Sequence, residues 1–99
     1  MASRKPHIET IFKTKNEEFF LRFTWKTPDI EAGATISSCA VSVAPTGLTL
    51  QGSVVIDVDA NRTAQMIKAG TVGGIYRVCF KITTSAAQVF EAFWDVHII

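Results

Sequence analysis

Residues 57–61, Asp-Val-Asp-Ala-Asn, come closest in this sequence to a metal-binding motif. Their alternating oxygen-bearing side chains match the opening of a calcium loop, where such oxygens surround one hard cation. That loop also needs glycine at its sixth position and a bidentate glutamate at its twelfth, and this chain has Arg62 and Lys68 there. We therefore interpret the two aspartates as solvent-facing strand residues and the asparagine as the start of a turn.

A second candidate metal site lies near the C-terminus, where Glu91, Asp95 and His97 share one face of a predicted strand. Aspartate and histidine two residues apart can place two ligands side by side. Glu91 and Asp95, however, are about 13 Å apart along an extended strand. We interpret this row as a solvated face and expect no metal ion.

Residues typical of catalysis lack the surroundings that they need. Ser37, Ser38 and Ser85 have no glycine framing of the kind found in a nucleophile elbow. The glycines within residues 70–74 precede a strand, whereas a phosphate-binding loop leads into a helix. We expect a protein that is not an enzyme and that uses no cofactor.

Charge does not point to a nucleic-acid or membrane partner. Ten Lys and Arg against nine Asp and Glu give a formal net charge of +1. A modest basic region, Arg4, Lys5, Lys13 and Lys15, is broken by glutamates and lacks interleaved aromatic residues that stack on bases. No apolar run approaches the ~20 residues of a membrane-spanning helix, and no secretory signal pattern follows the N-terminal basic residues. We expect a soluble protein without a membrane or nucleic-acid partner.

The elements that position these residues are predicted to be β-strands. The organising strand runs from Gly73 to Thr84, with apolar and polar side chains in alternation. Its apolar row is Tyr76, Val78, Phe80 and Ile82, and successive side chains of a strand point to opposite faces. Because the sequence holds other strands and no convincing amphipathic helix, the covering layer should be a second sheet.

Six further strands are predicted, over residues 17–26, 34–44, 48–51, 53–59, 63–68 and 88–99, of which 48–51 is either a short strand or an extended connection. The alternation changes phase near Ser37-Ser38, which predicts a bulge there. In 63–68, Ala64 and Met66 oppose Gln65 and Ile67. The pattern is typical of an all-β fold, an immunoglobulin-like antiparallel β-sandwich of about seven strands. We assign residues 13–99 to this domain and residues 1–12 to an extended N-terminal arm.

The two cysteines, Cys39 and Cys79, are spaced like the inter-sheet disulfide of antibody domains. Cys79 lies in the polar row of its strand, between Arg77 and Lys81, whereas a bridge between sheets needs both thiols inward. We predict that they are unbridged, in agreement with a reducing cytoplasmic compartment.

Apolar residues at both ends of the chain indicate a protein contact. Two interpretations of residues 1–12 stay open: a disordered start, or a segment that becomes ordered on a neighbouring subunit. The apolar residues of the arm favour the second. The candidate protein-contact residues are Ile8, Ile11, Phe12, Phe93, Ile98 and Ile99.

The segment 74–78, Gly-Ile-Tyr-Arg-Val, resembles the G-x-Y-x-C/V segment of immunoglobulin-like domains, whose tyrosine forms a corner by bonding nearby backbone. Tyr76 and Gly74 are the candidate structural corner. Over about residues 17–98 the chain resembles the small immunoglobulin-like virion proteins of tailed bacteriophages. The matching segments are Trp25, 34–38, 70–76, Thr83-Thr84-Ser85 and the closing strand, whereas Ala86-Ala87-Gln88 replaces the usual Asp-Gly hairpin.

This resemblance implies a non-enzymatic structural or accessory virion protein: a capsid decoration, neck or tail-associated subunit acting through protein–protein contacts. Its expected partners are other virion proteins, and it is expected as a homo-oligomer or in many copies on a symmetric assembly. Its expected location is the virion, and the host cytoplasm before assembly. The alternative is an immunoglobulin-like module that binds carbohydrate or a host surface, which an exposed cluster of aromatic and polar side chains at one end would favour.

Overall fold

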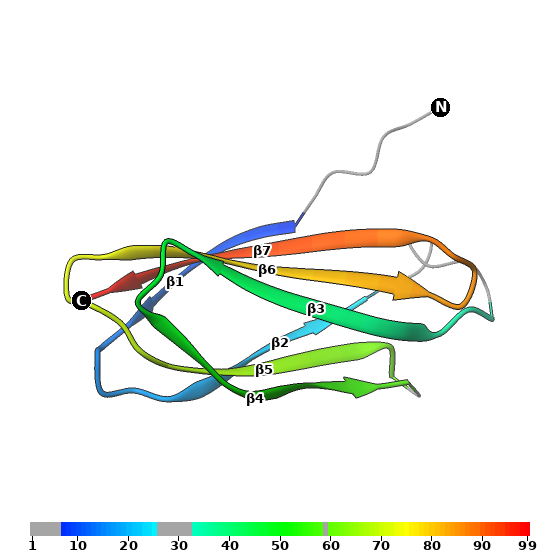
Figure 1. Cartoon of the computed structure of the whole chain (residues 1–99), viewed down its shortest axis with the longest axis horizontal. Coiled ribbons are helices and arrows are strands. Elements are labelled where there is room, and N and C mark those ends of the chain that lie inside the picture. The colour runs from blue at the N-terminus through cyan, green and yellow to red at the C-terminus, as the bar shows by residue number, and fades with distance from the viewer. Residues whose placement is uncertain (1–6, 26–32, 59) are drawn as a thin grey trace.

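The structure, a computed structural model, describes residues 7–25, 33–58 and 60–99. Seven strands form two facing sheets, of order β1-β7-β6-β3 and β2-β5-β4 (Figure 1). The fold is therefore the predicted all-β sandwich. None of the residues described forms a helix long and apolar enough to cross a membrane. The strands are β1 (His7–Lys13), β2 (Phe19–Thr24), β3 (Ile36–Ala44), β4 (Leu48–Asp57), β5 (Arg62–Ala69), β6 (Ile75–Thr84) and β7 (Val89–Ile98).

The predicted and observed strand counts agree, but two of the strands differ. The segments 48–51 and 53–59 were predicted as two strands, and the structure joins most of them in β4, with a register shift between Gln51 and Val55. Gly52 lies in this shift with a φ of 72°, a left-handed conformation that glycine adopts without a Cβ clash. The chain therefore passes through an irregular point and stays in the sheet.

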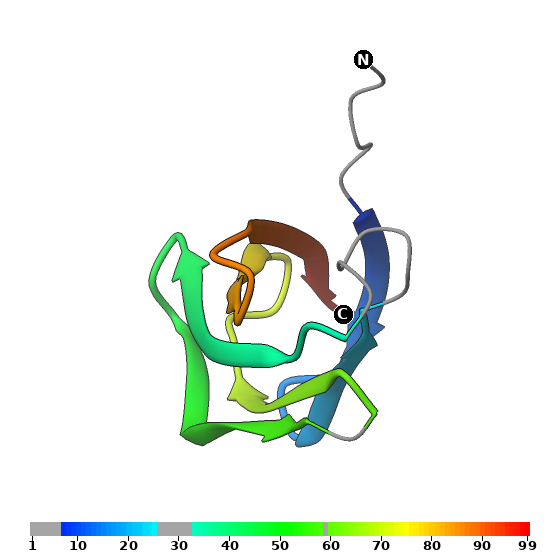
Figure 2. The same cartoon turned by 90° about the vertical axis from the view of Figure 1, so that its right-hand side faces the viewer.

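The other difference is β1, which occupies residues 7–13 and so includes most of the predicted arm. It pairs with β7 of the same chain, and this pairing is parallel. The prediction of an antiparallel sandwich is therefore wrong for the pairing of β1 with β7. Figure 2 looks along the strands and shows β1 at one margin of its sheet. The boundary predicted between residues 12 and 13 therefore falls inside a strand, and residues 1–6 lie outside the described part of the chain.

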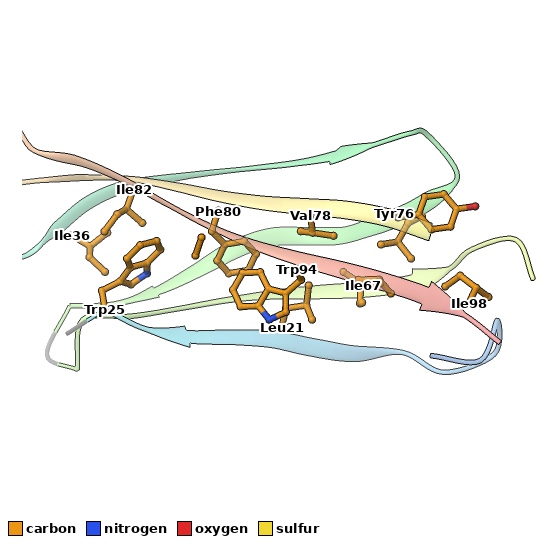
Figure 3. Close-up of a cluster of buried hydrophobic side chains, with 13 residues drawn as sticks. Leu21, Trp25, Ile36, Ile67, Tyr76, Val78, Phe80, Ile82, Trp94 and Ile98 are labelled. Atoms are coloured by element: carbon orange, nitrogen blue, oxygen red, sulfur yellow. The ribbon is translucent and has the colours of Figure 1, made fainter. Parts of the chain in front are cut away.

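The core lies between the sheets and contains the predicted apolar rows. Tyr76, Val78, Phe80 and Ile82 of β6 are all buried, and so are the β7 residues at 92, 94, 96 and 98 (Figure 3). Phe80 and Trp94 pack with ring centroids 4.5 Å apart. These assignments are confirmed, because burial follows the alternation of each strand.

The bulge predicted in β3 is also confirmed, by a register shift between Ile36 and Ser38. Beyond the shift, Cys39 packs against the core with the inward side chains of β3, whereas Cys79 is in the outward row of β6. The two thiols are free. Burial raises the pKa of each to about 11.

The structure assigns the two faces of β5. Thr63, Gln65 and Ile67 point into the core, and none is more than 2% exposed. The Gln65 side-chain amide donates hydrogen bonds to the carbonyl oxygens of Gln51 (3.1 Å) and Gly52 (3.2 Å), and to Met66 (3.0 Å). The two β4 carbonyls belong to the irregular point of that strand, so a buried polar side chain compensates for hydrogen bonds that the ladder does not make there.

Candidate protein-contact surface

The predicted corner residues lie where the loop after β5 enters β6. The Tyr76 side chain is 4% exposed, and its hydroxyl accepts a hydrogen bond from the backbone N–H of Thr71 (3.0 Å). This bond lowers the pKa of Tyr76. Gly74 lies against the ring, since a Cβ there would be 3.0 Å from the hydroxyl oxygen. The loop is also tied to β7 by Gly73 N–H donating to the Ile98 carbonyl (2.8 Å), so the corner fixes the adjacent ends of β6 and β7.

The described members of the two candidate metal sites do not come together as a metal site. The Asp57 carboxylate accepts a hydrogen bond from the Ala60 N–H (3.3 Å), three residues on, and Asp59 lies outside the described residues. Asp95 pairs with Arg77. Among the residues that the structure describes, no three His, Cys, Asp or Glu side chains gather closely enough to hold a metal ion.

The outer face of the four-stranded sheet carries apolar side chains from three adjacent strands, exposed on β1 and β6 and half-buried on β7. Ile8 and Phe12 of β1 are 53% and 63% exposed, and Ile75 of β6 is 54% exposed. Register brings them together: Ile8 lies beside Phe93, and Phe12 lies beside His97, which in turn neighbours Ile75. We name this set, Ile8, Phe12, Ile75, Phe93 and His97, the outer apolar surface.

An ion pair lies within the outer apolar surface. The Arg77 guanidinium donates to both carboxylate oxygens of Asp95, at 2.8 and 3.0 Å, and lies 5.5 Å from the centroid of the Phe93 ring. The hydrogen bond from Arg77 lowers the pKa of Asp95. Phe12 and His97 pack with ring centroids 5.3 Å apart. The surface is therefore apolar at its edges with a locally neutralised pair of charges inside it.

The structure separates the six predicted contact residues into two groups. Ile8, Phe12 and Phe93 lie together on the outer apolar surface, and Ile99 is 64% exposed at the chain end. Ile11 instead packs against the core, and Ile98 is 2% exposed within it. Both occupy inward positions of their strands, so their apolar character serves this domain's own interior.

Sequence reasoning missed Ile75 as a contact residue and considered His97 only as a possible metal ligand. Both belong to the outer row of their strands. The available signal was parity: Ile75 is two residues before Arg77 and is therefore an apolar side chain in a polar row.

Lys13, assigned from sequence to a basic region, is in fact fully buried. Its ammonium group donates to the backbone carbonyls of Ala69 (2.6 Å) and Thr14 (2.9 Å). Burial lowers its pKa. Lys13 therefore ties the end of β1 to the end of β5 and is unavailable to a phosphate group.

A pocket of about 210 Å³ opens on the outer face of the other sheet. It lies over Ala64, a small residue between larger neighbours on β2 and β4. The Arg22 guanidinium lies 5.1 Å from the centroid of the Phe20 ring, on the β2 side of the pocket. The lining residues are Phe20, Arg22, Val55, Asp57, Arg62, Thr63 and Ala64. Because Arg22 occupies the ring face, this arrangement does not favour stacking of a sugar on Phe20.

Comparison with protein families decides the identity. The family described as podophage GP4 fiber-tail adaptor protein gp77 matches residues 13–96. The chain belongs to this family. The match extends from the end of β1 nearly to the end of β7 and so includes both sheets. No curated protein matches the chain. The gp77 family makes this chain a tail-associated structural protein of a phage virion, and it replaces the broader expectation of a capsid, neck or tail protein.

Proposed function

We propose that this chain is an adaptor subunit that connects a fibre to the phage tail, and that it acts without catalysis, through protein–protein contacts. The family description supports the adaptor role. The outer apolar surface supports the contact mechanism and provides a place for another virion protein to bind. The corner at Tyr76 supports the interpretation of the sandwich as immunoglobulin-like.

The observation that carries this proposal is the clustering of exposed apolar side chains on one sheet face. Ile8, Phe12 and Ile75 are each more than half exposed and belong to strands joined through β7. Full burial of one such side chain contributes about 1.5–3 kcal/mol. Exposed apolar side chains gathered on one face mark interaction sites on soluble proteins. The Arg77–Asp95 pair gives the partner a polar group to align with.

The proposed partner is another protein of the virion, present with many copies of this chain in a symmetric assembly. Repeated contacts of one kind are how such assemblies close. Before assembly the protein resides in the host cytoplasm with the surface exposed.

The test compares Ile75→Lys with Val55→Lys. The two side chains are equally exposed, at 54%, but Val55 lies on β4, on the other sheet. Each variant is supplied to phage lacking the wild-type gene, and the amount of the protein per purified particle is measured. We expect Ile75→Lys to reduce incorporation at least tenfold and Val55→Lys to leave it unchanged. Equal incorporation of the two folded variants would refute this contact surface.

A further inference from the structure

The four sheet margins of this sandwich differ in how well they are protected against pairing with another chain. Exposed edges invite strand addition, and bulges and charged side chains oppose it. Among the described residues, β3 and β4 have register shifts, and the outward row of β2 contains Arg22. β1 has a continuous register over all seven of its residues. β1 and β2 therefore both have regular edges, and of the two only β1 has no charged side chain in its outward row.

The backbone direction of β1 follows from one hydrogen bond. The Lys13 carbonyl accepts from the Ile99 N–H (2.8 Å), so the peptide groups of Lys13 point toward β7. Alternate residues of a strand share this direction. The N–H and C=O groups of Ile8, Thr10 and Phe12 therefore point to the free margin. Within the described part of the chain, no backbone hydrogen bond outside the ladders uses these three residues.

The same three residues are self-complementary about Thr10. An antiparallel copy of β1 centred there places Ile8 opposite Phe12 of the copy, and Thr10 opposite Thr10. Each opposed pair exchanges two backbone hydrogen bonds, about six in all. The row of Ile8, Thr10 and Phe12 contains no charged side chain. Any other antiparallel register pairs fewer of these residues or places Thr10 opposite an apolar side chain.

We infer that β1 pairs with β1 of a second copy of this chain across a two-fold axis at Thr10, forming one continuous sheet from two four-stranded sheets. The contact is isologous, since one strand supplies both sides. Ile8 and Phe12 keep their outward direction, so the two outer apolar surfaces become neighbours. This inference goes beyond the proposed function and does not depend on it, because Ile75 on β6 tests that function without altering β1.

The expected strength of the dimer follows from its size. One strand on each side buries less than the roughly 1,200 Å² at which standard stable interfaces begin. We therefore expect the dimer to form in solution at high protein concentration. The test is accordingly made with the full chain at high concentration.

The first test is cross-linking through Thr10→Cys. Directly opposed hydrogen-bonded residues have Cα atoms about 5.5 Å apart, within the range that a disulfide spans. The control is Thr49→Cys, an exposed threonine on the edge strand β4. The native thiols, with pKa values raised to about 11, react slowly at neutral pH and are monitored in wild type. We expect at least tenfold more reducible dimer from Thr10→Cys than from Thr49→Cys, and equal yields overturn the inference.

Two further measurements test the register and the non-covalent contact. Ile8→Cys mixed with Phe12→Cys should form a mixed dimer, whereas neither alone should, and cross-linking of each alone at the same yield overturns the register. In sedimentation, Phe12→Lys should weaken self-association at least tenfold relative to Val72→Lys. Val72 is a loop control of similar exposure, since it is 60% exposed and Phe12 is 63% exposed. A wild-type protein that sediments as a monomer throughout overturns the dimer.

Discussion

Gln65→Leu tests whether a buried amide compensates for the irregular point of β4. Gln65 is 2% exposed, and its amide nitrogen faces the carbonyl oxygens of Gln51, Gly52 and Met66 at 3.0–3.2 Å. All three contacts are to acceptors, so the nitrogen of the amide must point toward them. Leucine has similar size and no donor. The substitution therefore removes the hydrogen bonds while keeping most of the packing.

The size of the effect follows from the number of hydrogens involved. The amide has two N–H hydrogens for three contacts, so about two net hydrogen bonds are lost, each worth roughly 1 kcal/mol. We expect the free energy of unfolding to fall by about 2 kcal/mol. For a domain of this length, that corresponds to a decrease in Tm of roughly 10 °C.

Thermal and urea unfolding of the purified variants measure this effect. The matched control is Gln51→Leu, since the side chain of Gln51 is exposed and its replacement should change stability by less than about 0.5 kcal/mol. If Gln65→Leu loses no more stability than Gln51→Leu, the proposed compensation is refuted.

Gln65→Glu extends the test to pH. A carboxylate facing carbonyl oxygens is unfavourable, and burial also favours the neutral form, so the folded pKa of this glutamate rises above its unfolded value. The acid form can still donate one hydrogen bond. Stability should therefore be greatest at acidic pH and decrease as the pH rises through the folded pKa. A pH-independent difference from wild type would contradict this reasoning.

Three further predictions concern the loops and the outer face. Gly70→Ala should lower Tm far more than Gly52→Ala. A Cβ at Gly70 would lie 2.7 Å from the side chain of a core isoleucine, whereas a Cβ at Gly52 would meet no atom within 4 Å. Tyr76→Phe should lower Tm by removing the corner hydrogen bond, and an unchanged Tm would argue against the corner. Arg77 lowers the pKa of Asp95 in the folded protein, so the pair stabilises the fold above the unfolded pKa of about 3.9. This stabilisation is lost as the pH falls through the folded pKa. Asp95→Asn should therefore weaken the acid dependence of the urea midpoint.

The sequence by itself determined the faces of most strands. In β6 and β7, strict alternation identified the buried rows, because adjacent side chains of any strand must point to opposite faces. The change of phase near Ser37 located the bulge of β3 for the same reason. These are local properties of a strand, and a period of two residues records them directly.

The tertiary structure alone decided which strands pair and what each pairing brings together. Residues 7–13 have no local feature that selects β7 as a parallel partner, yet that pairing places Ile11 against the core and Lys13 in a fully buried position. Gln65 lies in the inward row of β5, but its hydrogen-bond partners Gln51 and Gly52 belong to the irregular point of another strand, β4. The outer apolar surface likewise depends on register across β1, β7 and β6. Side-chain alternation is set within a strand, whereas partner and register are set by hydrogen bonds and packing between segments distant in sequence.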